Sequence, residues 1–209
     1  MTEQVKKTRI LNAAMKIFAC KGYQYTTIAE IAKEAGVSKG LVHVCFQNKL
    51  DILLDVILFF IESVNALINQ KLARCASPVE SLHAVFAALM ELMSESNKNL
   101  YWGHILKEVL PDTEKMKDEN LKKKYALIIG GARQLQLTLD DFIADGQRQG
   151  LIESTLKPQV IRQIIGGSSQ MLYQGLILGN HGRRVMGYTE EDVRLGIKAL
   201  IDKFVIKQP

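Results

Sequence analysis

The chain has 209 residues, of which 47% are hydrophobic and 23% charged, and its net charge is +5. This length allows one or two packed units, and the small number of prolines and aromatic residues favours helices over sheets. The longest apolar run, residues 56–61, is far shorter than the ~20 residues that span a membrane, and the start of the chain is polar and basic. We therefore expect neither a membrane partner nor a signal peptide.

The three cysteines, at positions 20, 45 and 75, are odd in number and show no C-x-x-C spacing. A disulfide framework or a zinc site is therefore not expected, and a cytoplasmic protein fits best. Cys45 is either an oxidant sensor or, as is commoner, an inert packed thiol.

The positive charge lies at the start of the chain. Residues 1–50 contain eight Lys and Arg against three Glu, an excess of five that equals the net charge of the whole chain. Basic side chains that neutralise DNA phosphates release counterions, and this release dominates non-specific DNA affinity. The charge distribution therefore indicates a DNA-binding segment; the alternative is an ordinary solvated face.

The first predicted helix runs from Thr8 to about Cys20. Its apolar residues recur at three- and four-residue steps and form one face, which we expect to cover the following segment. These residues are Ile10, Ala13, Ala14, Ile17 and Phe18.

Two short helices joined by a tight turn are predicted between residues 26 and 49. Thr27 and Glu30 have the spacing of a capping box at the start of the first helix. Gly36 suits a left-handed helix end, and Ser38 can cap a second helix from Lys39 to about Val44. This is the helix-turn-helix plan, whose second helix enters the DNA major groove, although structural helical corners share the spacing.

Residues 9–57 closely resemble the DNA-binding domain of the TetR/AcrR family of one-component repressors. One departure is His43-Val44-Cys45, where the family usually shows a run of Tyr or His; His43 can donate to a phosphate, but Val44 cannot. The matching residues are Ala13-Ala14, Ile17-Phe18, Gly22-Tyr23, Thr26-Thr27, Ile31-Ala32, Ala35-Gly36-Val37-Ser38-Lys39-Gly40, Phe46 and Lys49.

The resemblance implies an all-α fold with a three-helix helix-turn-helix domain at residues 1–48 and a larger helical effector-binding and dimerisation domain at residues 49–209. Lys39 suits a guanine edge or a phosphate, Gly40 allows close approach, and Leu41 suits a thymine methyl group. The residues expected to contact DNA are Thr26, Thr27, Ser38, Lys39, Gly40, Leu41, His43 and Lys49.

The rest of the chain reads as further helices. We expect a long helix over residues 49–75, two more over 79–96 and 100–110, and one over 114–149 that Gly130-Gly131 could break. The charged residues 114–124 read as a solvated face. Two last helices follow, from Pro158 to about Gly179 and from Thr189 to about Ile206.

The last two helices are the expected dimer face, because a single helix-turn-helix buries too little DNA surface for tight binding. The alternative is that their apolar stripes fill the core of one chain. These stripes comprise Ile164, Ile165, Ser168, Leu172, Gly175, Leu176 and Gly179 on one helix, and Val193, Ile197, Leu200, Ile201 and Phe204 on the other.

The larger domain is expected to hold a small apolar effector, because Met and aromatic side chains suit an adaptable pocket as well as an ordinary core. The segment from Met171 to Gly179 faintly resembles regulators of fatty-acid metabolism that sense acyl-CoA. The candidate ligand-binding residues are Phe60, Phe86, Met90, Met93, Trp102, Tyr125, Leu137 and Tyr173.

The sequence thus predicts a homodimeric, ligand-responsive repressor of a palindromic operator. An activator, or a helical interaction module that does not bind DNA, stays open as an alternative. Four scattered histidines and the lack of H-E-x-x-H, G-x-S-x-G and P-loop motifs argue against an enzyme, so no catalytic residue, metal or cofactor is expected.

Overall fold

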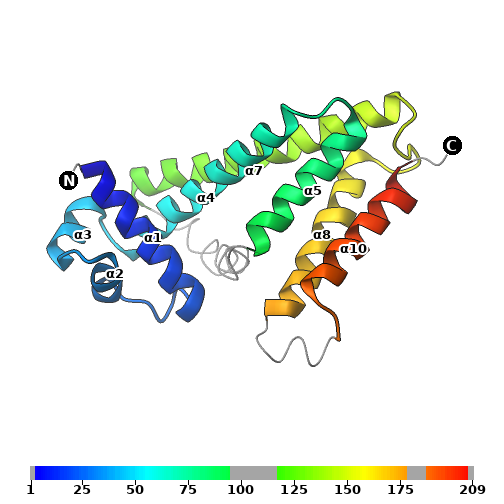
Figure 1. Cartoon of the computed structure of the whole chain (residues 1–209). Coiled ribbons are helices and arrows are strands. Elements are labelled where there is room, and N and C mark those ends of the chain that lie inside the picture. The colour runs from blue at the N-terminus through cyan, green and yellow to red at the C-terminus, as the bar shows by residue number, and fades with distance from the viewer. Residues whose placement is uncertain (1–2, 95–116, 178–186, 207–209) are drawn as a thin grey trace. The chain divides into compact units, whose positions relative to one another are not determined.

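The computed structural model describes residues 3–94, 117–177 and 187–206. Within these ranges every regular element is a helix, apart from one isolated antiparallel bridge between Ile152 and Ile206 (Figure 1). The all-α fold is therefore confirmed. None of the described helices is both long and apolar enough to cross a bilayer. The helix expected over residues 100–110 lies outside the described residues.

Two compact units divide the chain. Unit 1 comprises Met1–Ser63 and Tyr101–Ala132, and unit 2 comprises Val64–Leu100 and Arg133–Pro209. Helices α4 (Lys49–Leu72) and α7 (Glu119–Arg148) each contribute residues to both units. The domain boundary after residue 48 stays a prediction.

Unit 1 contains α1 (Glu3–Lys21), α2 (Ile28–Ala35), α3 (Lys39–Cys45) and the first half of α4. Helix α1 packs on α2, and α2 packs on α3. The expected apolar face of the first helix is buried, with Ile17 at its half-buried edge. The core of unit 1 includes Ile10, Phe18, Ile31, Val42, Phe46, Leu53 and Ile57.

The predicted caps of the helix-turn-helix are present. The Thr27 hydroxyl accepts from the Glu30 N–H at 3.3 Å, and the Glu30 carboxylate accepts from the Thr27 N–H at 2.9 Å. Gly36 ends α2 with φ 62°, a left-handed conformation that favours glycine. Ser38 caps α3 by accepting from the Leu41 N–H at 3.2 Å.

Helix α7 continues through Gly130-Gly131, so the break considered from the sequence is absent. Its N-terminal half belongs to unit 1, where Leu121 and Ile128 are buried in the core. Farther along, Ile143 is buried in the core of unit 2. Burial at both ends outweighs the cost of a helical glycine, which is roughly 1 kcal/mol relative to alanine.

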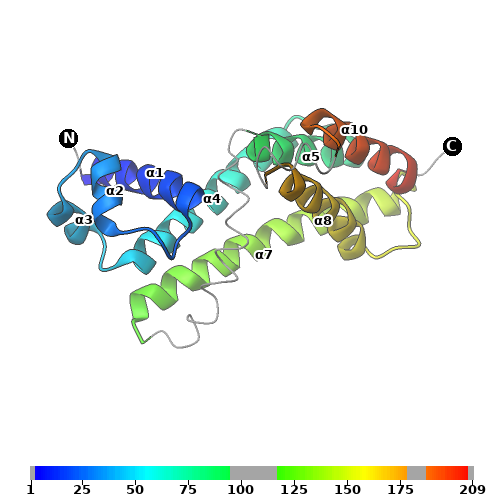
Figure 2. The same ribbon diagram turned by 90° about the horizontal axis from the view of Figure 1, so that it is seen from below.

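Unit 2 contains α5 (Pro78–Ser94), the second half of α7, α8 (Pro158–Ile177) and α10 (Glu190–Leu200), and it ends in a π-helical turn over Ile201–Val205. Helix α10 packs against both α5 and α8, as Figures 1 and 2 show. The core of unit 2 includes Leu82, Phe86, Met90, Ile143, Ile161, Ile165, Val193, Ile197 and Ile201.

Four residues expected at the dimer face are instead buried within the single chain: Ile165, Val193, Ile197 and Ile201. For these residues the alternative reading, a monomer core, is correct. Leu172 and Leu200 pack partly against the same core. The side chains of Leu176 and Phe204 lie outside the described residues, as does Gly179.

Candidate nucleic-acid interface

Helix α3 divides sharply into a buried and an exposed side. Val42 is fully buried, and Phe46, which follows the helix, is 2% exposed, so both anchor α3 to the core. Ser38, Lys39, Gly40 and His43 are exposed, while Leu41 is half-buried. A short helix held on one side with donors on the other has the form of a recognition helix that enters a groove.

The two threonines before α2 have different surroundings. Thr26 is buried, and its hydroxyl donates to the Gly22 carbonyl at 2.7 Å. Thr27 is exposed, and its hydroxyl lies 2.8 Å from the Glu30 carboxylate. Ion pairing with Lys21 and the hydrogen bonds from Thr27 lower the pKa of Glu30 to about 2. The start of α2 is therefore held by a charged carboxylate at neutral pH.

Lys49 holds the loop between α1 and α2. Its ammonium donates to the carbonyls of Tyr23, Gln24 and Thr26 at 2.8, 3.2 and 3.0 Å and lies 4.4 Å from the Tyr23 ring centre. Burial lowers the pKa of this ammonium. An ammonium has three N–H donors, so a phosphate contact requires Lys49 to leave at least one carbonyl. Its predicted contact with DNA stays a prediction.

Two basic residues at the start of α1 are also engaged within unit 1. The Arg9 guanidinium donates to the Ala35 carbonyl, at the end of α2, at 2.8 Å. Lys7 lies 2.6 Å from a carboxylate oxygen of Asp55. Part of the positive charge near the start of the chain therefore stabilises the helix-turn-helix itself.

A buried cluster of charges, which the sequence analysis missed, joins α1, α4 and α7. It consists of Asp51 and Asp55, 6% and 7% exposed, with Lys7 and Lys124. Lys124 contacts both carboxylates, reaching Asp55 at 2.7 Å. The signal was two aspartates, four residues apart, inside an apolar stretch of α4. At Lys124, the assignment of residues 114–124 to a solvated face was wrong.

The two contacts in this cluster differ in kind. Lys124 hydrogen-bonds to Asp51, whereas Lys7 approaches Oδ2 of Asp55 without hydrogen-bond alignment, and that oxygen has no partner of that kind among the described residues. Burial alone would lower the pKa of Lys124, but its hydrogen bonds and attraction to the two aspartates outweigh burial and raise that pKa. Lys124 is therefore held in its charged form.

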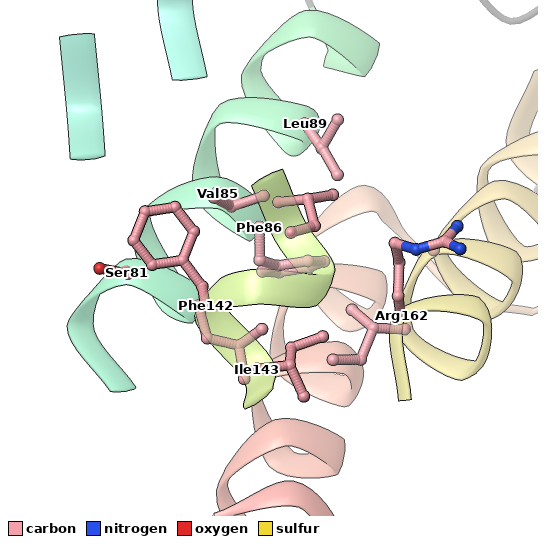
Figure 3. A pocket seen from close by; sticks show the side chains of 11 residues that line it. Ser81, Val85, Phe86, Leu89, Phe142, Ile143 and Arg162 are labelled. Atoms are coloured by element: carbon pink, nitrogen blue, oxygen red, sulfur yellow. The ribbon is translucent and has the colours of Figure 1, made fainter. Parts of the chain in front are cut away.

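An apolar cavity of about 70 Å³ lies in unit 2 among α5, α7 and α8 (Figure 3). Arg162 borders it, and the Arg162 Nε donates to the Asp140 carboxylate at 2.7 Å. The volume is about half of the roughly 150 Å³ that admits benzene to an engineered core, so it suits a short apolar group. The lining is Ser81, Leu82, Val85, Phe86, Leu89, Leu139, Phe142, Ile143, Arg162, Ile165 and Gly166.

Among the described residues, Phe86 is the one predicted effector residue that lines this cavity. Met90 is buried in the core of unit 2, and Leu137 is 47% exposed. Phe60 and Tyr125 are half-buried residues of unit 1. Trp102 and the side chains of Met93 and Tyr173 lie outside the described residues. Phe142 and Arg162 were missed, because sequence spacing does not reveal which helices surround a void.

A comparison with protein-family models matches residues 10–56 to the model described as "Bacterial regulatory proteins, tetR family". These residues include all of α2 and α3, their capping residues and most of α1. The chain belongs to the TetR family. It is therefore a transcriptional regulator with a DNA-binding helix-turn-helix, as the sequence analysis predicted.

The similarity of this TetR-family protein to known regulators extends beyond that domain. It is 28% identical over 163 residues to the fatty acid metabolism regulator protein of Bacillus subtilis, an alignment that covers 78% of this chain and 79% of that one. Two solved structures share its fold. The regulator FadR of Bacillus subtilis, in complex with stearoyl-CoA, matches with a TM-score of 0.69 and 21% identity over 92% of this chain and 96% of that one. A regulator from Saccharomonospora viridis, in complex with choline, gives 0.73 and 19% over 98% and 100%.

The ligands of these two structures differ greatly in size and charge, so the fold of a TetR-family protein does not determine its effector. Among the described residues of this protein, no group of three or more His, Cys, Asp and Glu side chains could hold a metal ion.

Proposed function

We propose that this TetR-family regulator is a homodimeric repressor that binds a palindromic operator and is released by an apolar small molecule. The observation that carries the DNA-binding part is the exposed side of α3, with Ser38, Lys39, Gly40 and His43 opposite the buried Val42. Such a helix offers donors to base edges and phosphates while its other side fixes it to the core.

The proposed DNA contacts divide into two groups. Lys39, Gly40, Leu41 and His43 face the groove from α3, with Ser38 at its N-cap. Thr27 and the first N–H groups of α2 and α4 meet phosphates, because helix N-termini attract anions. Lys49 and Thr26 act mainly by fixing the loop between α1 and α2, since their polar atoms already bond to it.

The homodimer is supported by an exposed apolar stripe on α8 and α10. Val160, Ile164 and Met171 lie at four- and seven-residue steps on α8 and are 42%, 39% and 77% exposed, and Leu195 on α10 is 57% exposed. Burying such a stripe against its symmetry mate forms a helical bundle between two copies. Two copies then meet two half-sites, which requires a palindromic operator.

The effector is proposed to place a short apolar group, such as the end of an acyl chain, in the cavity of about 70 Å³ in unit 2. Fatty acyl-CoA is a candidate, because the Bacillus subtilis relative is named for fatty acid metabolism and the FadR structure contains stearoyl-CoA. Leu139, Phe142 and Ile143 line the cavity from α7, and Lys124 on the same helix pairs with α4. An effector that favours one position of α7 thereby shifts operator affinity, typically by ~1–3 kcal/mol.

The test is anisotropy titration of a labelled duplex that spans the DNA upstream of the protein's own gene. Wild-type protein should bind as a dimer, and Lys39→Ala should lose roughly 1–3 kcal/mol, since each good base contact contributes that much. Lys203→Ala, which removes the same charge from an exposed site in unit 2, is the control. Equal affinity of the two variants would contradict the role of α3.

Release is tested by adding stearoyl-CoA, and separately choline, to the preformed complex. The proposal expects stearoyl-CoA to dissociate the DNA and choline to leave it bound, because the cavity lining is almost entirely apolar. Dissociation by choline alone would overturn the choice of effector class.

A further inference from the structure

A second cavity, of about 390 Å³, lies in unit 1 at the C-terminal end of α3. It is formed by two segments that are far apart in the sequence: residues 43–51, from the end of α3 to the first turn of α4, and residues 120–127 near the start of α7. Its lining is His43, Val44, Cys45, Phe46, Gln47, Asp51, Asn120, Lys123, Lys124 and Leu127.

Among the cations at this cavity, Lys123 is the one available to an outside anion. Lys124 is bound to Asp51 and Asp55, and the neighbouring Lys122 pairs with Glu119 at 2.7 Å. Lys123 is exposed and has no carboxylate partner among the described residues. His43, on α3, is also exposed and lines the same cavity. Among the described residues, the cavity therefore presents one ammonium without a carboxylate partner, from α7, and one imidazole, from α3.

The remaining lining combines apolar and neutral groups. Val44 and Leu127 are 78% and 59% exposed, so the open side of the cavity presents two large apolar side chains to solvent. Asp51 adds no net repulsion of an anion, because its carboxylate accepts from Lys124 and from the Gln47 N–H at 3.0 Å. The combination suits a chain that carries both anionic oxygens and C–H surface.

A DNA strand has this chemistry, because its phosphates alternate with the apolar edges of deoxyribose. The N-terminal residues of a recognition helix meet the bases, so its C-terminal end lies towards the backbone that borders the groove. Val44, at that end, has no donor for a phosphate. Lys123 lines the same cavity and supplies a charged donor from α7.

We propose that this cavity is a second contact with the DNA backbone, in which Lys123 and His43 bind a phosphate while Val44 and Leu127 pack on the adjoining sugar. The interface would then extend beyond the helix-turn-helix to a helix whose other half lines the cavity of unit 2. This inference rests on the proposed DNA binding.

The experiment measures the salt dependence of binding for full-length wild-type, Lys123→Gln and Lys122→Gln proteins. Lys122 is a matched control, because it is also exposed, lies one residue away on α7, and its substitution removes the same charge. The probes are a mixed-sequence duplex, which needs no knowledge of the operator, and the duplex upstream of the gene. Circular dichroism verifies that the variants are folded.

Each lost phosphate contact lowers the slope of log affinity against log salt by about 0.9. Between 50 and 200 mM salt, Lys123→Gln should therefore lose about 3.5-fold less affinity than wild type for every protomer bound. Lys122→Gln should keep the wild-type slope, and Val44→Lys in the Lys123→Gln background should restore it.

Equal slopes for Lys123→Gln and wild type would overturn the proposal while leaving DNA binding through α3 intact. Equal loss in both lysine variants would also overturn it, since it would indicate a diffuse charge effect. If wild-type protein binds neither duplex in low salt, the proposed function fails together with this contact.

Discussion

The buried charge cluster of unit 1 gives the most quantitative prediction. Lys124→Met removes the ammonium but keeps an unbranched stem of similar length, so the packing beside Leu121 and Ile128 should persist. What remains is Asp51, which keeps one hydrogen bond from the Gln47 N–H, and Asp55, which keeps only its misaligned approach to Lys7. The carboxylates of Asp51 and Asp55, which are 6% and 7% exposed, then lose the ammonium that both of them contact.

The expected cost follows from burial. Removing one partner of a fully buried ion pair costs about 3–5 kcal/mol, because the other charge is left uncompensated. The Lys124 side chain is 22% exposed, so water relieves part of this and we expect about 2–3 kcal/mol. For a chain of this size that lowers the melting temperature by roughly 4–12 °C.

Thermal and urea unfolding, followed by circular dichroism, measure the loss. Lys123→Met, next along the same helix but exposed, should stay within about 0.5 kcal/mol of wild type. Asp55→Asn should cost less in the Lys124→Met background than in wild type, because the charge it removes is by then unpaired. The pKa of Lys124 is raised above its ordinary value of 10.5. The stabilisation that Lys124 contributes is therefore complete below pH 10.5 and is lost only as pH rises above that value. Equal stability of the two lysine variants, or additive effects of Lys124→Met and Asp55→Asn, would refute the reasoning.

Four further predictions follow from single contacts. Thr27→Ala should lower the free energy of unfolding in urea by about 1 kcal/mol. In this variant the pKa of Glu30, followed by NMR, should rise from about 2. In wild type the stabilisation that Glu30 contributes should disappear as pH falls from 4.5 towards about 2. Gly130→Ala should raise stability by about 0.5–1 kcal/mol, because an added Cβ meets nothing within 4 Å and alanine favours the helix; a loss would show that α7 needs flexibility there. Met171→Glu should give a monomer in sedimentation, whereas Leu156→Glu, at an exposed site off the α8–α10 stripe, should stay dimeric. Gly166→Leu should fill the cavity of unit 2, so it should keep operator affinity in anisotropy titrations but lose the response to stearoyl-CoA.

The helix-turn-helix was predictable because its determinants are local. A capping box, a glycine with positive φ and a serine cap all lie within twelve residues of Thr27, and each leaves a sequence signal. The apolar period of the first helix likewise predicted its buried face. The local sequence of the first quarter of the chain is therefore sufficient to predict its helices and their caps.

The errors concern partners that are distant in sequence. Lys124 lies in a charged run whose period suggests solvent, yet its carboxylate partners are on α4, and Asp51 is 73 residues earlier in the chain. The stripe that contains Ile165 and Ile197 was correctly read as apolar, but periodicity cannot distinguish packing within a chain from packing between copies. Gly130-Gly131 suggested a break because glycine has a low helix propensity. The burial of Leu121, Ile128 and Ile143 on both sides, which keeps α7 continuous, was not evident from the sequence.

The magnitudes connect these features to regulation. An effector can change operator affinity only by its differential affinity for two arrangements of the protein, typically ~1–3 kcal/mol. Lys124 holds α7 to α4 by an interaction of about the same size, and Leu139 lies roughly 20 Å farther along the same uninterrupted helix at the cavity. Lys124→Met should therefore weaken the effect of stearoyl-CoA on operator affinity more than it weakens operator binding itself; the opposite order would mean that α7 serves only to stabilise unit 1.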